Sequence, residues 1–91
     1  MHEDIDISVV IPLFNEEGSL RELYTRLSQV LSAVAKAWEI LFIDDGSRDQ
    51  SPEILDELAQ KDSRVGVLRF RRNFGKAAAL DAGFRRARGR L

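Results

Sequence analysis

Three short apolar segments, separated by amphipathic segments, constrain the fold of this chain more than any other feature. Ile7–Leu13 (ISVVIPL) and Trp38–Ile43 (WEILFI) are nearly continuous apolar runs, and Val65–Phe70 (VGVLRF) is a third, less apolar one. Short runs rich in β-branched and aromatic residues are typical of strands that are buried on both faces of a parallel sheet. Because such strands alternate here with helical patterns, the sequence predicts an α/β fold with right-handed crossovers.

The first two helices are predicted from apolar spacing and from their starting residues. Apolar residues recur at three- and four-residue spacing over Leu20–Val34, which predicts an amphipathic helix. Ser19 and Glu22 fit a capping box at its beginning. Ser51 followed by Pro52 predicts the N-cap and the first position of the second helix.

A third helix is predicted over Lys76–Arg88, with Gly89 as its C-cap. The complete order is then β-α-β-α-β-α, and no repeat or linker interrupts it. Three parallel strands make a small sheet, and the 91 residues end where a fourth strand is expected. Residues 1–91 are therefore interpreted as a single, incomplete domain, truncated before the fourth strand.

Composition excludes several classes of site. The chain has no cysteine, so disulfides, thiolate zinc sites and cysteine nucleophiles are excluded, and its one histidine is His2. No apolar run approaches the roughly 18–20 residues of a membrane span. The net charge of −1 hides a division: residues 1–63 carry five Lys/Arg against fourteen Asp/Glu, whereas residues 64–91 carry nine Lys/Arg against one acid.

The candidate site residues follow the three predicted strands, where open α/β sheets bind their ligands. They are Pro12, Asn15 and Glu16 after the first strand; Asp44, Asp45 and Gly46 after the second; and Arg71, Arg72, Gly75 and Lys76 after the third. Carboxylates and Asn can bind a base edge and ribose hydroxyls. Basic groups beside a helix N-terminus can receive phosphate oxygens. The pattern indicates a site for a nucleoside diphosphate, with acidic side chains on one side of the site and basic side chains on the other.

Other interpretations of the same residues remain open at this point. The segment Asp44–Ser47 could be a simple turn, because Asp and Gly favour turns. The basic segment 64–91 could bind nucleic acid or an acidic membrane surface, although the acids of the remaining chain would repel a polyanion. A phospho-acceptor signalling domain would carry its acidic pair after the first strand. A dinucleotide-binding domain would carry Gly-x-Gly-x-x-Gly there, and this sequence does not.

Three blocks of the sequence resemble family 2 glycosyltransferases. They are Val9–Glu17 (VVIPLFNEE), Ile43–Ser51 (IDDGSRDQS), which resembles the signature D-D-G-S-x-D-x-T/S, and Arg72–Phe84 (RNFGKAAALDAGF). The third block is typical of the polyprenyl-phosphate branch, the relatives of dolichyl-phosphate and undecaprenyl-phosphate sugar transferases. Together the blocks cover about residues 6–90 in the family's order.

The resemblance implies a GT-A fold, a Rossmann-like half that binds a UDP- or GDP-linked sugar, and an inverting transfer to a polyprenyl phosphate or glycan. Pro12, Asn15 and Glu16 would line the nucleoside pocket, and Asp44 and Asp45, followed by Gly46, would contact base and ribose. Lys76, with Gly75 behind it, would lie near the diphosphate, and Arg71 and Arg72 are weaker candidates for the same role. Nucleic acid is not expected as a partner.

The family's remaining parts are expected beyond Leu91. These are the Asp-x-Asp motif that holds Mg²⁺ or Mn²⁺, the acceptor-side residues, the general base and any membrane anchor. The 91-residue chain is therefore expected to recognise the donor without catalysing transfer, and to contain no catalytic residue or metal ligand. The full-length enzyme is expected at the cytoplasmic face of the membrane. The family's strand order 3-2-1-4 would leave the first strand as an exposed edge, through which the chain is expected to self-associate.

Overall fold

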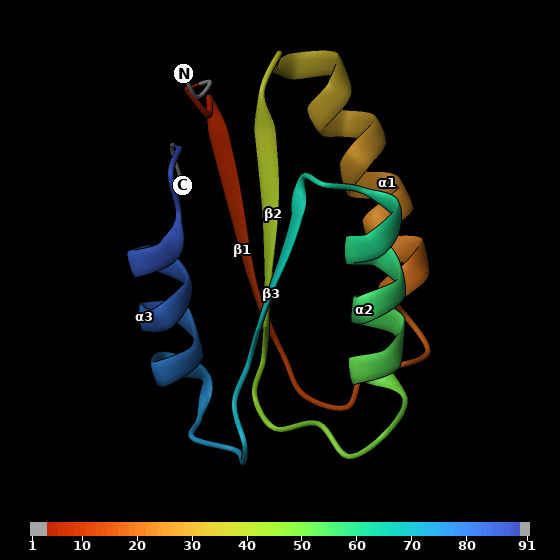
Figure 1. The fold of residues 1–91 in the computed structure, drawn as a ribbon, viewed down its shortest axis with the longest axis vertical. Coiled ribbons are helices and arrows are strands. Elements are labelled where there is room, and N and C mark those ends of the chain that lie inside the picture. The colour runs from red at the N-terminus through yellow and green to blue at the C-terminus, as the bar shows by residue number, and fades with distance from the viewer. Residues whose placement is uncertain (1–3, 90–91) are drawn as a thin grey trace.

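The computed structural model describes residues 4–89 and contains a three-stranded parallel sheet between two layers of helices (Figure 1). The elements, in chain order, are β1 (Ile7–Leu13), α1 (Leu20–Val34), β2 (Trp38–Asp44), α2 (Ser51–Lys61), β3 (Val65–Arg69) and α3 (Lys76–Arg86). The strand order is β1-β2-β3, so β2 is central. Helix α3 covers one face of the sheet, and α1 and α2 cover the other. The predicted α/β class and the β-α-β-α-β-α order are confirmed.

Burial differs sharply between β1 and β2. All seven residues of β2 are buried, as its apolar run predicts. Val9 and Ile11 of β1 pack against the larger core and Val10 against the smaller, so both faces are covered as expected, but five of its seven residues are only partly buried, so the expected full burial was wrong. The reason is that, among the described residues, β1 pairs with β2 alone. Self-association through the free edge of β1 stays a prediction.

Alternate residues of β2 belong to two different cores. Ile40 and Phe42 pack in the larger core with α1 and α2, whereas Leu41 and Ile43 pack with Ala79 of α3. Side chains alternate between the faces of a strand, so β2 contributes to both layers. Burying one such side chain contributes about 1.5–3 kcal/mol. The alternation also predicts that Asp44, the last residue of β2, and Asp45, which follows it, point to opposite layers.

The serines predicted to cap α1 and α2 have other partners. No side chain caps the N-terminus of α1. Instead of pairing with Glu22, Ser19 donates its hydroxyl to the Oε2 of Glu16 at 3.1 Å. Ser51 is the first residue of α2 rather than its N-cap, which is Gln50. The Ser51 hydroxyl accepts the backbone N–H of Glu16 at 3.0 Å. Ser19 therefore occupies the predicted N-cap position of α1, but the capping box and the N-cap role of Ser51 were wrong. The Ser19 hydroxyl bonds to Glu16, three residues away, and the Ser51 hydroxyl bonds to a distant part of the chain.

The segment after α3 is held to the sheet by a buried carboxylate. Helix α3 ends at Arg86, and Gly89 is not its C-cap as predicted but donates its N–H to Ser8 Oγ at 2.7 Å. Glu39 of β2 accepts the Ser8 hydroxyl at 2.6 Å and the N–H of Arg88 at 2.8 Å. Burial opposes ionisation of Glu39, but hydrogen bonds from Ser8 and Arg88 outweigh it and hold its pKa below the ordinary value.

Candidate functional site

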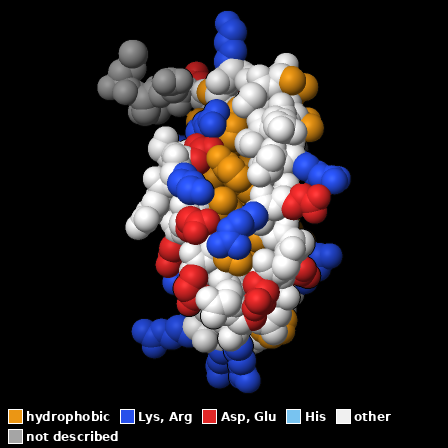
Figure 2. Space-filling view, turned by 90° about the vertical axis from the view of Figure 1, so that its right-hand side faces the viewer, with side chains coloured by type: hydrophobic (Ala, Val, Ile, Leu, Met, Phe, Trp, Pro, Cys, Tyr) orange, Lys and Arg blue, Asp and Glu red, His pale blue; other side chains and the backbone are white. Residues whose placement is uncertain are grey.

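The loops that follow the three strands meet at one end of the molecule, the lower end in Figure 1. This convergence follows from the parallel pairing, because the carboxyl ends of parallel strands share one edge of the sheet. Figure 2 faces α1 and α2, over which acidic and basic side chains are interspersed. Lys and Arg side chains project from the lower end in the same view. The end that carries the three loops thus has exposed basic side chains together with the exposed acids Glu16 and Glu17.

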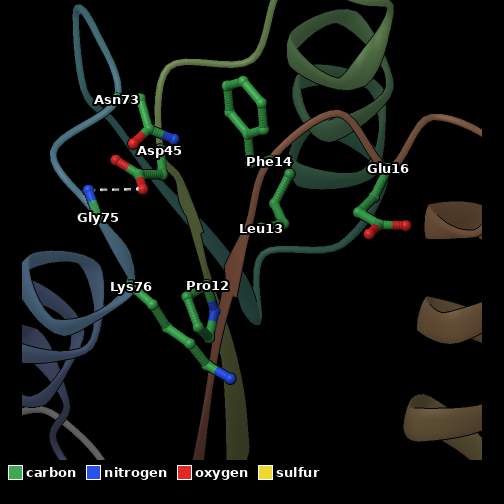
Figure 3. Close-up of a pocket in the computed structure, with 8 residues that line it drawn as sticks. All are labelled: Pro12, Leu13, Phe14, Glu16, Asp45, Asn73, Gly75 and Lys76. Atoms are coloured by element: carbon green, nitrogen blue, oxygen red, sulfur yellow. Dashed lines mark hydrogen bonds between the residues drawn. The ribbon is translucent and has the colours of Figure 1, made fainter.

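Two neighbouring cavities lie among these loops. The first has a volume of about 370 Å³ and is lined by Pro12, Leu13, Phe14, Glu16, Asp45, Asn73, Gly75 and Lys76 (Figure 3). The second, of about 310 Å³, is lined by Phe14, Asn15, Gly46, Ser47, Arg48, Arg71, Arg72 and Asn73. Both are open and of the size at which small-molecule sites begin. Every predicted site residue except Asp44 therefore lines one of the two cavities.

Asp45 connects the loop after β2 to the beginning of α3. It is 4% exposed, and its two carboxylate oxygens accept the N–H groups of Phe74 at 2.8 Å and Gly75 at 3.0 Å. The bond to Gly75 is drawn in Figure 3. These two bonds fix the main chain immediately before Lys76, so Asp45 determines where the N-terminus of α3 lies relative to the first cavity.

Asp44 points to the opposite layer, as the alternation along β2 predicts. Its side chain is fully buried, and Oδ1 accepts the N–H of Ser47 at 2.8 Å. No described residue hydrogen-bonds its Oδ2, and the nearest cation is Arg69, whose Nε lies 3.7 Å from that oxygen. Arg69 also pairs with Asp56 of α2 at 3.0 Å. Asp44 thus faces α2, behind the loops, rather than the cavities.

Two glycines of the site have positive φ angles. Gly46 has a φ of +80°, and a Cβ there would lie 2.6 Å from the backbone nitrogen of Asn73. Gly75 has a φ of +102°, with open space where its Cβ would be. Only glycine adopts such angles without strain. At Gly46 the absence of a side chain also lets the loops after β2 and β3 pack backbone against backbone.

The loop after β1 is bonded to side chains of the loop after β2. The backbone N–H groups of residues 15–17 each donate to a different side chain: Asn15 to Ser47 Oγ at 2.8 Å, Glu16 to Ser51 Oγ at 3.0 Å and Glu17 to Asp49 Oδ2 at 3.1 Å. In return, Arg48 N–H donates to Asn15 Oδ1 at 2.9 Å and Gln50 N–H donates to Glu17 Oε1 at 3.1 Å. Five hydrogen bonds thus join two loops that are more than 30 residues apart in sequence.

Lys76 begins α3 at the wall of the first cavity. Its side chain extends past Pro12 in Figure 3 and is exposed. The first turn of α3 contains no acid, so the partial positive charge of this helix end is not neutralised there. Backbone N–H groups at a helix N-terminus, together with an ammonium group, can bind phosphate oxygens.

Phe14 and Asn73 also line both cavities. Asn73 belongs to the polar loop expected after the third strand, whereas the sequence interpretation gave Phe14 no role. Phe14 directly follows the buried Leu13, and its side chain is 41% exposed. An aromatic residue in a loop at the carboxyl end of a strand was the available signal. Its exposed ring provides an apolar surface on which a planar group can stack.

Two further findings concern metals and membranes. Within residues 4–89, no three His, Cys, Asp or Glu side chains are grouped so that they could hold a metal ion. The described residues therefore do not supply a set of ligands for the cation that the family resemblance implies. No helix in the same range is long and apolar enough to cross a membrane.

The structure thus contains an α/β fold with two cavities at the carboxyl ends of a parallel sheet. The family model for "Glycosyl transferase family 2" matches residues 8–91, so the chain belongs to the family 2 glycosyltransferases. The resemblance seen in the three sequence blocks is thereby confirmed.

Among curated proteins, the chain is 43% identical over 89 residues to "Uncharacterized glycosyltransferase YkcC" of Bacillus subtilis, covering 98% of this chain and 28% of that protein. It is 46% identical over 86 residues to "Undecaprenyl-phosphate 4-deoxy-4-formamido-L-arabinose transferase" of Pseudomonas aeruginosa, covering 93% of this chain and 25% of that protein. The chain thus spans about a quarter of the length of the curated relatives it matches.

The solved structure of S. aureus TarS is similar in fold. The two superpose with a TM-score of 0.76 at 23% identity, over 93% of this chain and 15% of that one. The match confirms the fold: the three parallel strands and three helices correspond to part of that GT-A structure.

Proposed function

We propose that this chain carries the donor-recognition part of an inverting glycosyltransferase that uses a nucleotide sugar. The observation that carries the proposal is the first cavity, which is lined by the acids Glu16 and Asp45 and by Lys76 at the N-terminus of α3. Acidic groups suit hydroxyl and N–H donors of a nucleoside, and the basic helix end suits a diphosphate. One cavity thus offers both chemistries that a nucleoside diphosphate requires.

Within this proposal the residues that line the two cavities have distinct roles. Phe14 stacks on the base, Pro12 and Glu16 line the nucleoside, and Lys76 contacts the diphosphate, with Arg71 and Arg72 on the phosphate side in the neighbouring cavity. Exposed aromatic rings and charged groups around an open cavity support this arrangement.

The acceptor is proposed to be a polyprenyl phosphate, because the Pseudomonas aeruginosa relative is named for transfer involving undecaprenyl phosphate. Such a lipid places the reaction at the membrane, and we propose its cytoplasmic face. A divalent cation on the diphosphate is also proposed for a protein of the relatives' length, with ligands outside residues 4–89. The 91 residues themselves are proposed to bind the donor without transferring the sugar.

The alternative function, binding of nucleic acid or an acidic membrane through residues 64–91, has less support. Arginines of this segment pair with acids in the structure: Arg64 with Asp62, Arg69 with Asp56, Arg85 with Asp81 and Arg88 with Glu39. Each pair reduces the charge that is available to a polyanion, and residues 90–91 lie outside the described part. A donor site needs only the few basic side chains of the loop after β3.

The proposal is tested by titrating UDP and GDP into the ¹⁵N-labelled chain and following the amide resonances. We expect one nucleotide to shift residues near Asp45 and Lys76. Lys76→Met removes the ammonium and should weaken binding about tenfold, whereas Lys61→Met, an exposed change at the end of α2, should not. Shifts confined to the C-terminal half of α3, or equal affinities of the two variants, would contradict the proposal.

A further inference from the structure

The side chains of Ser47, Asp49 and Ser51 occupy every second position after β2, and all three are directed at the loop after β1. Ser51 is fully buried, and Ser47 and Asp49 are half-buried, whereas the intervening Arg48 and Gln50 are exposed. The three inward side chains accept the N–H groups of three consecutive residues, 15–17. Their oxygens are thus directed at the main chain of the loop after β1.

The bonded segment forms one wall of the site. Its neighbour Phe14 lines both cavities, Asn15 lines the second and Glu16 lines the first. Asn15 has a φ of +54°, a left-handed conformation that asparagine tolerates better than most residues. Because the segment has no strand or helix bonds of its own between Leu13 and Leu20, these long-range bonds decide its path.

Asp49 is suited to this role as an ionised acceptor. Its Oδ2 accepts the N–H of Glu17, and its Oδ1 accepts the N–H of Ser51 at 2.8 Å. Burial opposes its ionisation, but the hydrogen bonds from Ser51 and Glu17 outweigh that effect and hold the pKa of Asp49 below its ordinary value. The carboxylate therefore connects the start of α2 to the loop after β1.

We infer that Ser47, Asp49 and Ser51 are positioning residues of the donor site. They hold the main chain of residues 15–17 and so place Phe14 and Glu16 against the bound nucleotide, without contacting it themselves. This assignment rests on the proposed function. It accounts for two positions of the block 43–51 for which the cavities alone give no reason, since Asp49 and Ser51 line neither of them, whereas Ser47 also lines the second cavity.

The experiment combines amide exchange with titration of UDP and GDP on the whole 91-residue chain. Each alanine variant should affect its own partner: S47A should speed exchange at the amide of residue 15, S51A at residue 16 and D49A at residue 17. Losing one hydrogen bond of this kind corresponds to about a tenfold change in exchange. A variant that merely destabilises the fold would instead speed exchange throughout the sheet.

Binding supplies the second readout. Each of these variants should raise the Kd of the nucleotide about tenfold, and Ser47→Thr, which keeps the hydroxyl, should restore it. Ser63→Ala is the matched control, since Ser63 is exposed between α2 and β3, at the amino end of that strand.

The outcomes separate this inference from the proposed function. If the wild type binds a nucleotide and the alanine variants bind as tightly as S63A, the positioning role is refuted while donor binding stands. If the wild type binds neither UDP nor GDP, the proposed function fails. Amide exchange then tests by itself whether the three side chains hold the loop, and unchanged exchange rates at residues 15–17 in the alanine variants would refute the assignment.

Discussion

Replacing Gly46 by alanine measures how closely the loops after β2 and β3 pack on one another. A Cβ at this position would lie 2.6 Å from the nitrogen of Asn73 and 2.8 Å from the Cα of Arg72, both of which are main-chain atoms. Main-chain atoms cannot turn away as the end of a long side chain can. The loop after β3 must therefore move, and with it one wall of both cavities.

The expected cost has two parts. The φ of +80° costs a non-glycine residue about 1–2 kcal/mol. Overlap with the backbone adds about 1–3 kcal/mol, the usual cost of overpacking. Two other glycines separate these parts. Gly75→Ala has a positive φ but open space around its Cβ, so only backbone strain of about 1–3 kcal/mol is expected. Gly18→Ala has neither problem and should change stability by less than about 0.5 kcal/mol.

The assay is urea unfolding of the three variants at neutral pH, followed by titration of UDP and GDP. We expect Gly46→Ala to lower the free energy of unfolding by about 2–5 kcal/mol, a large fraction of the roughly 5–15 kcal/mol typical of a domain. We also expect it to weaken nucleotide binding. If Gly46→Ala unfolds within about 0.5 kcal/mol of Gly18→Ala, the close packing of the two loops is refuted.

Two further predictions concern buried carboxylates far from the cavities. Arg64 and Tyr24 donate hydrogen bonds to Asp62 and lower its pKa from 3.8 to about 2. The folded state therefore gains stability from Asp62 above pH 3.8 and loses it as the pH falls towards 2. Asp62→Asn should consequently cost about 2 kcal/mol at pH 6 and almost nothing at pH 2. Urea unfolding that gives the same difference in stability between wild type and Asp62→Asn at every pH from 2 to 6 would contradict this. Glu39→Gln should lower the free energy of unfolding by about 1–3 kcal/mol and speed exchange of the Arg88 backbone N–H, because the neutral glutamine side chain accepts hydrogen bonds less strongly than the carboxylate. If the Arg88 N–H were protected as well as in the wild type, the role of Glu39 in holding the segment after α3 would be contradicted.

The elements of the fold could be predicted because each is determined by a local pattern. β1 was predicted at Ile7–Leu13, the range it occupies, and β2 and β3 differ from prediction by one residue at one end. Apolar runs of this length and helical spacing are properties of neighbouring residues. Burial of β1 was overestimated, because exposure depends on which strands flank it and not on its own composition.

The meeting of the three loops was also predictable, since parallel strands bring their carboxyl ends together. The roles of individual polar side chains were not. Asp44 and Asp45 are chemically identical and adjacent, yet one faces α2 and the other α3. The partners of Ser19 and Ser51 were wrong for a related reason: a hydroxyl bonds to whatever the fold brings near, and for Ser51 that group is 35 residues away.

The bonds between the two loops have a consequence for how this surface can change over generations. The acceptors on Ser47, Asp49 and Ser51 engage main-chain N–H groups, which every residue except proline possesses. The side chains of Phe14 and Glu16 take no part in those three bonds. Under the proposed function, substitutions at these two positions would alter which ligand is preferred while the path of the loop is inherited unchanged.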